Sequence, residues 1–457
     1  MSVIDRLADL RARVRGTVTT PNDPGWDTAR QAWNLAVDQR PAVVVEAAGA
    51  DDVEATVLAA REAGLRVAVQ GTGHGASARG GDLEDAILLR TSSMRTVTID
   101  PERRVARVQA GAMWGDVMAA AAPHGLTALH GSAPDVGVVG YTLGGGIGWF
   151  ARKHGLASGQ VTAAEVVLPD GRRTEITERS CPQLFWALRG GGGSFGVVTE
   201  LEFSLLAIEE VHAGALLWPQ ERAAEILRAW RDLADTFPDE VTSIGRLLNF
   251  PPAPQVPEPL RGRKMVVVEA ASLLGQAETD ALLAPLRALG PELDTFTASA
   301  PEALLHLHND PPGPVPAFGG GVVISELPDA AIDTVDELCG AASGAPIIGI
   351  EFRHLGGALG RAPEGAGAMA TLPGRFAVYT VGPLPVPEAR PALEQQIGAT
   401  LDALAPWTSG STYLNFAETP VDATAAFPTT TVRRLRDIAA AIDPDGVLHP
   451  NHSVRAY

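Results

Sequence analysis

The sequence predicts an α+β protein with more than one domain. Its 457 residues exceed what one hydrophobic core usually serves. Apolar runs and alternating stretches that indicate strands occur together with amphipathic stretches that indicate helices. A hydrophobic content of 46% and a charged content of 20% are typical of a globular chain.

The first half opens with a strand–helix–strand unit over residues 42–70. AVVVEAA predicts a buried strand, Asp51 or Asp52 is expected to cap the next helix, and Gly64 to end it before the strand RVAVQG. A crossover of this length predicts a parallel pair of strands. The later predicted elements are strands at 85–90, 96–100 and 104–111, a helix at 114–125, a hairpin over 160–177 turning at Asp170 and Gly171, and an alternating strand within 195–206.

From about residue 207, long amphipathic helices alternate with strands. The helices are predicted at 220–236, 276–289, 328–342 and 387–405, and the strands at 264–273, 347–355 and 375–382. A helix, a turn and an extended tail follow over 431–454.

The net charge and the composition limit which classes of binding partner and which cellular compartment the sequence favours. A net charge of −18 argues against nucleic acid, because that binding depends on neutralising phosphates. No apolar run of roughly 18 residues predicts a membrane-spanning helix. The start has Ile4, Leu7, Leu10 and Val14 at helical spacing and lacks the pattern of a secretory signal. Two distant cysteines, Cys181 and Cys339, suit reduced thiols. We therefore expect a cytoplasmic protein with a small-molecule partner, of unspecified oligomeric state.

Three glycine clusters lie near the ends of predicted strands: GTGHG (71–75), GYTLGGGIG (140–148) and RGGGGSFG (189–196). Each alone is compatible with a tight turn. Together they favour a concave surface of bare amides, which suits the pyrophosphate of a nucleotide. The nicotinamide fingerprint G-x-G-x-x-G is not met, so a Rossmann fold is disfavoured.

These clusters, with PQLFWALRGGGGSFGVVTELEF and VLHPNHSV, resemble the berberine-bridge-enzyme-like branch of the vanillyl-alcohol-oxidase flavoprotein family. The resemblance runs over about residues 30–206 and 410–454. It implies a PCMH-type FAD-binding domain of two α+β subdomains (1–206), a substrate-binding domain with a large antiparallel sheet covered by helices (207–412), and a C-terminal return to the FAD domain (413–457).

The resemblance also implies how FAD is held. His74 matches the family histidine that bonds covalently to the flavin, while Gln70 and Thr72 replace the family's usual arginine and glycine. Ala133 stands where many members have a second linking cysteine, so a single link through His74 is expected. The residues expected to contact FAD are Gln70, Gly71, Thr72, Gly73, His74, Gly75, Ala76, Ser132, Gly137, Gly140, Tyr141, Gly144, Gly145, Gly148, Gly196, Val197, Val198, Asn415 and Asn451.

Two segments resemble the family's catalytic strands. In STYLNF, Tyr413 and Asn415 match a Y-x-N strand that faces the flavin, and Tyr413 is a candidate base if its surroundings lower its pKa. The alternative is a core tyrosine. In IEFRHLGGA, alternation places Glu351 and Arg353 on one face and His354 on the other. Glu351 is a candidate substrate-site residue, and a simple ion pair with Arg353 is the alternative.

A metal site is not expected. His306 and His308 have ligand-like spacing for a strand, but no acidic or cysteine partners are evident in the sequence.

The expected function is an FAD-dependent oxidase that takes hydride from a C–H beside an alcohol, hemiacetal or amine of a small molecule and passes the electrons to oxygen. By analogy with the family, the step would tailor a secondary metabolite. The alternatives are an oxygenating or redox-neutral rearrangement or cyclisation, a flavin dehydrogenase that does not use oxygen, and a binding protein in which flavin only fills the scaffold.

Overall fold

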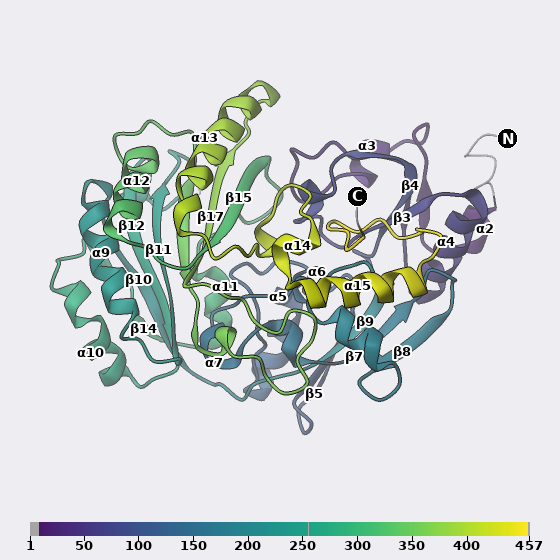
Figure 1. Ribbon diagram of the computed structural model, residues 1–457, viewed down its shortest axis with the longest axis horizontal. Coiled ribbons are helices and arrows are strands. Elements are labelled where there is room, and N and C mark those ends of the chain that lie inside the picture. Colours follow the sequence, from purple (N-terminus) through teal and green to yellow (C-terminus); the bar gives the residue numbers. More distant parts are fainter. Residues whose placement is uncertain (1–8, 255, 456–457) are drawn as a thin grey trace.

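The computed structural model describes residues 9–254 and 256–455 and has the predicted α+β architecture (Figure 1). The described residues form three sheets, of four, five and eight strands. The α-helices are Leu10–Arg13 (α2), Trp26–Ala29 (α3), Ala50–Ala63 (α4), Trp114–Ala121 (α5), Val138–Leu143 (α6), Ala151–His154 (α7), Pro182–Leu188 (α8), Ala223–Ala234 (α9), Gln276–Arg287 (α10), Leu304–Leu307 (α11), Asp329–Cys339 (α12), Arg390–Ala403 (α13), Ala423–Ala426 (α14) and Thr429–Ile442 (α15). The helical spacing at Ile4 and Leu7 lies outside the described residues.

The four-stranded sheet has the order β1-β2-β4-β3, with β1 at Thr17–Thr19, β2 at Arg40–Glu46, β3 at Arg66–Gln70 and β4 at Asp82–Arg90. The strands on either side of α4 run in the same direction, as predicted, but they are not neighbours. Each pairs in parallel with β4, which lies between them. Because Ile87, Leu88 and Leu89 of β4 are completely buried, this apolar strand takes an inner position.

The start of α4 differs from the prediction. Gly49 occupies the N-cap position, and no side chain caps the helix there. Asp52 instead accepts hydrogen bonds from the backbone N–H groups of Arg15, Gly16 and Ala48. Its carboxylate therefore ties the N-terminal segment to the first turn of the helix. Gly64 ends α4 in the left-handed conformation, as predicted.

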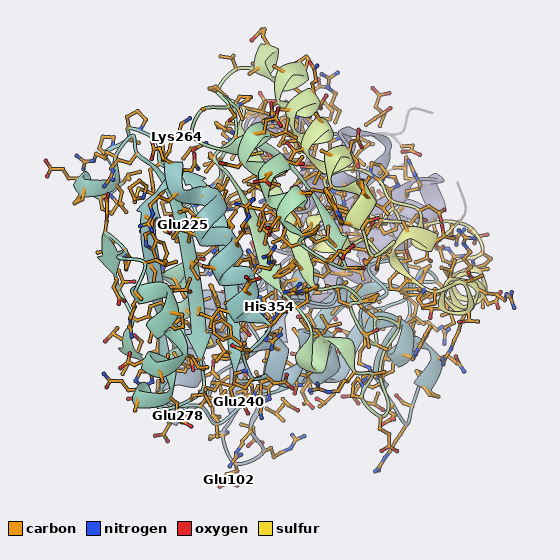
Figure 2. All side chains as sticks on the ribbon, turned by 60° about the vertical axis from the view of Figure 1, so that its left-hand side comes forward. Glu102, Glu225, Glu240, Lys264, Glu278 and His354 are labelled. Carbon is orange, nitrogen blue, oxygen red and sulfur yellow. The ribbon has the colours of Figure 1, made fainter. Side chains whose placement is uncertain are left out.

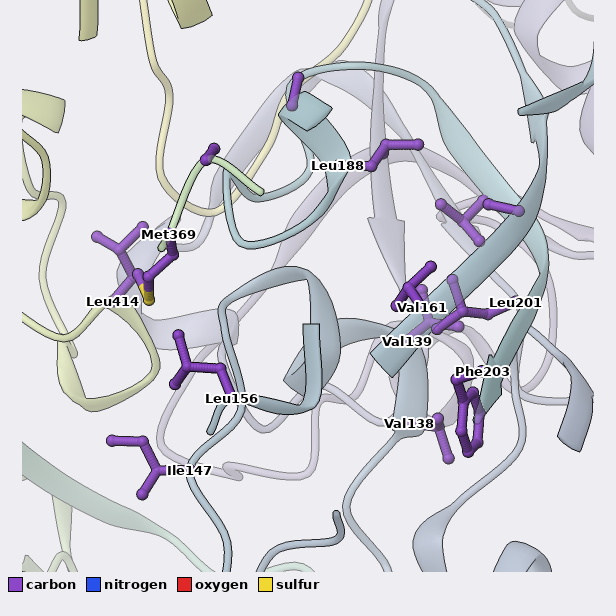
Figure 3. Close-up of a cluster of buried hydrophobic side chains, with 14 of the residues drawn as sticks. Val138, Val139, Ile147, Leu156, Val161, Leu188, Leu201, Phe203, Met369 and Leu414 are labelled. Carbon is purple, nitrogen blue, oxygen red and sulfur yellow. The ribbon is translucent and has the colours of Figure 1, made fainter. Parts of the chain in front are cut away.

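The five-stranded sheet is antiparallel, with the order β5-β6-β9-β7-β8. Its strands are Val97–Asp100 (β5), Val105–Gln109 (β6), Val161–Val167 (β7), Arg173–Thr177 (β8) and Val197–Ser204 (β9). Strands β7 and β8 form the predicted hairpin, and Gly171 has φ +87° at its turn. The core beside this sheet also takes in Met369 and Leu414 from later in the chain (Figure 3).

The eight-stranded sheet is antiparallel and follows the order β13-β10-β12-β11-β16-β17-β15, with β14 also paired to β10. Its strands are Val211–Pro219 (β10), Val241–Asn249 (β11), Lys264–Ser272 (β12), Leu293–Asp294 (β13), Thr297–Ser299 (β14), Ala317–Ile324 (β15), Gly349–His354 (β16) and Phe376–Pro383 (β17). Helices α9, α10, α12 and α13 cover one face and share one hydrophobic core with it (Figure 1). The sequence did not predict five strands of this sheet: β10, β11, β13, β14 and β15.

The end of the chain returns to its beginning. After α15, the N–H of Val67 donates to the Val447 carbonyl, and the N–H of His449 donates to the Val67 carbonyl. The tail thus lies beside β3, just before the first glycine cluster. The division after residues 206 and 412 stays a prediction; the five-stranded sheet ends with β9 at Ser204, and the eight-stranded sheet begins with β10 at Val211.

Much of the chain's negative charge lies at the surface. Glu102, Glu225 and Glu278 project outward from the ribbon, whereas His354 lies inside (Figure 2). Within the described residues, no helix has the length and apolar character needed to cross a membrane. Cys181 and Cys339 are free thiols.

Candidate active site

The first glycine cluster holds His74 in a turn directly after β3. Gly73 has φ +90°, a conformation that side chains other than glycine rarely adopt. A Cβ atom there would lie 2.8 Å from the Cα atom of Ala32. The turn therefore packs against the preceding loop without a side chain and presents the imidazole of His74.

The surroundings of His74 favour its neutral form. Its ring stacks on Trp33 with centroids 4.2 Å apart, and the Thr72 hydroxyl lies 2.7 Å from Nδ1. Asp135 Oδ1 is 3.8 Å from Nε2, and Asp135 Oδ2 accepts a 2.6 Å hydrogen bond from the Trp33 indole. Burial lowers the pKa of His74 to about 4, against the opposing charges of Asp135 and Asp310. At neutral pH the ring keeps a free lone pair, which bond formation to carbon requires.

The second cluster surrounds α6. Gly137 is its N-cap, and Tyr141 contacts the loop that follows it, because a Cβ on Gly146 or Gly148 would crowd the Tyr141 ring or its hydroxyl. A Cβ on Gly148 would also overlap the carbonyl oxygen of His130. The 144–148 loop therefore depends on bare glycine to pass this close to its neighbours.

This region has the properties of a site for a polar ligand. The Tyr141 hydroxyl, the Thr142 hydroxyl and Asp135 Oδ1 are buried without a hydrogen-bond partner among the described residues. Buried polar atoms normally have partners, so these positions suit the polar atoms of a bound group. A Cβ on Gly140 would meet no atom within 4 Å, which leaves open space beside the same helix. The predicted FAD-contacting segment thus fits a nucleotide cofactor.

The C-terminal segment brings Tyr413 and Asn415 to this loop. The Tyr413 hydroxyl accepts 3.0 Å hydrogen bonds from the Ile147 N–H and from Asn415 Nδ2, and Nδ2 also donates to the Tyr141 carbonyl. Burial raises the pKa of Tyr413, although these two hydrogen bonds and the charge of Arg353 act in the opposite direction. The predicted strand is wrong here, because Tyr413 precedes a 3₁₀ turn at Leu414–Phe416.

Asn451 reaches the first cluster from the tail. A Cβ on Gly75 would lie 2.9 Å from its Nδ2, and its Oδ1 accepts a 3.1 Å hydrogen bond from Arg79. The structure therefore brings together three predicted segments that are distant in the sequence: the 71–75 turn, the 137–148 segment and the 413–451 tail.

Other predicted FAD residues have side chains directed elsewhere. Gln70 is buried with its amide engaged, accepting from Gln39 and donating to the Gln31 carbonyl. Val197 and Val198 lie in two different hydrophobic cores, so only their backbone, with that of Gly196, is available to a ligand. The side chains of the remaining small residues are too short to hold a group except by backbone contact; these are Gly71, Ala76, Gly144 and Gly145.

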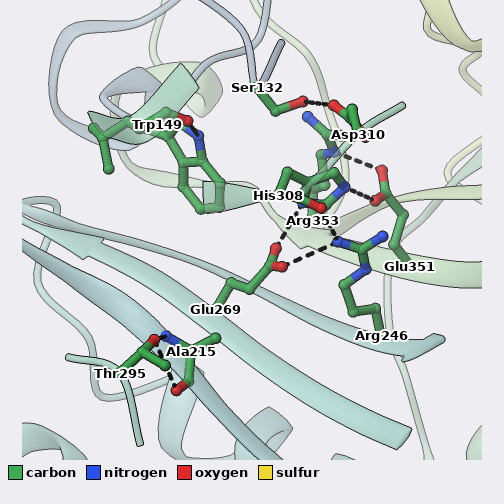
Figure 4. A network of polar contacts seen from close by, with 11 residues as sticks. Ser132, Trp149, Ala215, Arg246, Glu269, Thr295, His308, Asp310, Glu351 and Arg353 are labelled. Atoms are coloured by element: carbon green, nitrogen blue, oxygen red, sulfur yellow. Dashed lines mark hydrogen bonds and ion pairs between the residues drawn. The ribbon is translucent and has the colours of Figure 1, made fainter. Parts of the chain in front are cut away.

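The face of the eight-stranded sheet that its helices leave uncovered carries a buried chain of charges (Figure 4). Arg246 Nη1 lies 3.0 Å from Glu269 Oε1, and Glu269 Oε2 lies 2.6 Å from His308 Nδ1. His308 Nε2 is 2.7 Å from Glu351 Oε2, and Glu351 Oε1 is 2.6 Å from Arg353 Nε. We call these five residues the charge chain. Its signs alternate, with a cation at each end.

Both imidazole nitrogens of His308 face carboxylates, which requires the doubly protonated ring. Burial and Arg246 lower the pKa of His308, but Glu269, Glu351 and Asp310 together raise it to about 9. Burial opposes ionisation of Glu351, yet Arg353 and His308 outweigh it and hold its pKa below the ordinary value. The predicted ion pair of Glu351 and Arg353 therefore exists, and both Glu351 oxygens are engaged.

The expectation that His306 and His308 lie in a strand without acidic partners is wrong for His308. His308 follows the short helix α11 and does not lie in a strand, and its two acidic partners come from β12 and β16. Sequence distance concealed them, because Glu269 and Glu351 are 39 and 43 residues away. The described residues contain no group of three or more potential ligands that could hold a metal ion.

A narrow cavity separates the 147–151 segment from strands β11 and β16. Ile147, Trp149 and Ile244 give it apolar walls, and Arg353 and His354 border it as well. His354, predicted to face away from Arg353, packs its ring against Phe376 in the core of the helix-covered face, and both residues border the cavity. Burial and Arg152 lower the pKa of His354 to about 3, so this ring is neutral.

Several residues of the site were not identified from the sequence. Trp33 and Asp135 hold His74, and Arg246 and Glu269 belong to the charge chain. The signal that could have found the last two is a single charge within an otherwise apolar strand, as in VVVEAA and SIGRLL.

Comparison with known proteins indicates the class of protein, a flavoprotein with an FAD-binding domain. A family model described as FAD binding domain matches residues 41–177. The chain is 34% identical over 221 residues to xylooligosaccharide oxidase of Thermothelomyces thermophilus, covering 48% of this chain and 44% of that protein. It is also 34% identical over 206 residues to (R)-6-hydroxynicotine oxidase of Paenarthrobacter nicotinovorans, covering 45% of each. The chain thus spans a little under half the length of these curated relatives.

The fold agrees over the whole chain with BBE-like 1 of Physcomitrella patens, at a TM-score of 0.84 and 17% identity, covering 100% of both chains. These findings define a protein with an FAD-binding domain and the PCMH-type oxidoreductase fold. The chain is similar in sequence to FAD-linked oxidases and in fold to berberine-bridge-enzyme-like proteins, which supports an FAD-linked oxidoreductase of that kind.

Proposed function

We propose that this protein is an FAD-dependent oxidase that removes hydride from a C–H beside an alcohol, hemiacetal or amine of a small molecule, with oxygen as the electron acceptor. One observation carries the proposal: three segments that are distant in the sequence contact one another. The His74 turn lies against the start of the 137–148 segment, and the Tyr413 hydroxyl accepts a hydrogen bond from the same segment. The named relatives, an oligosaccharide oxidase and a hydroxynicotine oxidase, support oxidation of such groups without choosing between them.

FAD would be held by the backbone of the 71–75 and 137–148 segments, by Asn415 and Asn451, and by a single covalent link through His74. Ala133 offers no sulfur for a second link. When bound, FAD supplies the hydride acceptor for the oxidation. The neutral imidazole of His74, fixed by Trp33 and Thr72, supports a link at this residue.

Within the protein, Tyr413 is the proposed acceptor of the substrate O–H or N–H proton. Burial raises the pKa of Tyr413 above its ordinary value, and the two hydrogen bonds that its oxygen accepts, with the charge of Arg353, act against that rise and would stabilise a phenolate. Glu351, the second predicted catalytic residue, has both oxygens committed, so it holds His308 and Arg353 in place at the substrate side.

The decisive assay supplies candidate sugars, alcohols and amines to the holoenzyme and measures oxygen consumed and hydrogen peroxide formed. Equal amounts of peroxide and two-hydrogen-depleted product support an oxidase. Flavin that substrate reduces and air does not reoxidise identifies a dehydrogenase. A product of unchanged or oxygen-increased mass identifies rearrangement or oxygenation. We further place the enzyme in the cytoplasm, which its two free thiols support, and in secondary metabolism by analogy with the family alone.

A further inference from the structure

Asp135 lies beside His74 with one carboxylate oxygen unused. Its Oδ2 accepts a 2.6 Å hydrogen bond from the Trp33 indole, whose ring stacks on His74 with centroids 4.2 Å apart and an interplanar angle of 22°. Its Oδ1 is 3.8 Å from His74 Nε2 and is buried without a hydrogen-bond partner among the described residues. Trp33 therefore fixes the carboxylate and the imidazole relative to each other, with Oδ1 beside Nε2.

The contacts of the two ring nitrogens favour one neutral tautomer of His74. A proton on Nε2 is attracted by the Asp135 carboxylate, whereas a lone pair on that nitrogen is repelled by it. The Thr72 hydroxyl, 2.7 Å from Nδ1, has a proton to donate to a lone pair there. The favoured ring thus carries its proton on Nε2 and its lone pair on Nδ1.

A carboxylate at this position also stabilises the charge that bond formation creates. When Nδ1 of a neutral imidazole bonds to carbon, the ring becomes a cation that still holds the proton on Nε2. Burial disfavours a cationic ring and lowers the pKa of His74 to about 4, while the charges of Asp135 and Asp310 oppose that effect. Asp310 is exposed and accepts a hydrogen bond from Ser132, so Asp135 is the carboxylate that lies against the ring.

We propose that Asp135 is a positioning residue that sets the tautomer of His74 and promotes the covalent attachment of FAD. This inference rests on the proposed link through His74, because it names the residue that assists it. In the overall step, Nδ1 bonds to the flavin 8α carbon, a C–H bond at that carbon breaks, and the Nε2 proton passes by way of Asp135 to solvent. The electron pair of the broken C–H bond passes through the flavin to oxygen, which takes up the two released protons as hydrogen peroxide.

Asp135→Asn removes the charge with little change of shape, and Asp135→Glu restores a carboxylate. Each full-length protein, purified from riboflavin-limited cells, is mixed with FAD in air. The intact mass after denaturation follows the linked fraction, and the visible absorbance follows the flavin bound. We expect Asp135→Asn to bind FAD but to link it at least roughly tenfold more slowly than the wild type, with Asp135→Glu between the two. Asp402→Asn, at an exposed aspartate of α13, is the matched control and should link like the wild type.

Three results of this comparison overturn the inference. The first is linkage in Asp135→Asn at the wild-type rate. The second is an Asp135→Glu protein that links no faster than Asp135→Asn, because lost packing and not lost charge would then explain the slow reaction. The third is an Asp135→Asn protein that binds no FAD, because Asp135 would then hold the cofactor or the fold.

The nitrogen that carries the flavin gives a test without any variant. Proteolysis of the linked wild type releases a flavin peptide, whose proton contacts are measured by NMR. Because Nδ1 adjoins Cγ, the 8α-methylene protons should lie close to the β protons of His74. A contact with the imidazole Hδ2 instead shows a link at Nε2 and overturns the inference.

The outcomes separate this inference from the proposed function. A wild type that never links FAD loses both the inference and the single link, while peroxide formed with extractable flavin still supports the oxidase. A wild type that links FAD independently of Asp135 loses the inference alone. A protein whose linkage requires Asp135 but which forms no peroxide with any candidate substrate keeps the inference and loses the oxidase function.

Discussion

Replacing His308 with glutamine tests the charge chain through its pH dependence. In the folded protein, burial and Arg246 lower the pKa of His308, but Glu269, Glu351 and Asp310 raise it to about 9 from an ordinary value of 6.5. A group with a raised pKa contributes stability that is complete below its unfolded pKa and is lost as the pH rises through the folded pKa. The window is therefore pH 6.5 to 9.

The size of the effect follows from the shift. A change of 2.5 pKa units corresponds to about 3 kcal/mol at about 1.4 kcal/mol per unit. At pH 6, His308→Gln should lower the free energy of unfolding by about 3–5 kcal/mol, as expected when a buried charge loses its partner. Above pH 9 the deficit should shrink by about 3 kcal/mol, because the wild-type imidazole is then neutral as well.

Urea unfolding, followed by tryptophan fluorescence and far-ultraviolet circular dichroism between pH 6 and 10, measures this difference. His124→Gln, at an exposed histidine, is the control and should track the wild type at every pH. Other groups that titrate above pH 9 are present in all three proteins and cancel in the comparison. A deficit of His308→Gln that stays constant from pH 6 to 10 would refute a doubly protonated His308 within the chain.

Three further predictions concern the flavin side of the site. His74→Ala should leave the flavin extractable, so that acid precipitation releases the yellow colour into the supernatant. Tyr413→Phe should lower kcat by about 10²–10⁴ if the phenol takes the substrate proton, with flavin content unchanged; an unaltered kcat removes Tyr413 from that role. Gly148→Ala should reduce flavin occupancy in the purified protein, because its Cβ overlaps the His130 carbonyl oxygen, whereas Gly159→Ala, where a Cβ meets no atom within 4 Å, should keep full occupancy.

The sequence predicted where the helices and strands lie better than it predicted which strands pair with one another. The helix α4 and the strands around it were placed because their apolar spacing and the final Gly64 are local signals. The position of β4 between β2 and β3 was not, because strand order depends on which strand can bury both faces. Tyr413 illustrates the same limit, since the family's Y-x-N pattern was expected in a strand and lies at a 3₁₀ turn.

The site shows a similar division. His74, Tyr413 and Asn451 were found from local motifs, and the fold brings them together. The partners of His308 were not found, because two carboxylates from strands 39 and 43 residues away meet it only through sheet register. Gln70 was expected at the cofactor, but its amide is used by Gln39 and the Gln31 carbonyl. Motif spacing identifies which residues carry the chemistry, and packing decides which of their atoms are free to use.

The attachment of flavin through His74 is the claim on which the proposed oxidase depends. The direct measurement is the mass of the intact chain after denaturation, together with the visible spectrum of the acid-precipitated pellet. A yellow pellet and a mass increased by one FAD, both abolished by His74→Ala, are the results expected. A colourless native protein of unmodified mass that takes up no flavin when FAD is supplied would contradict the account.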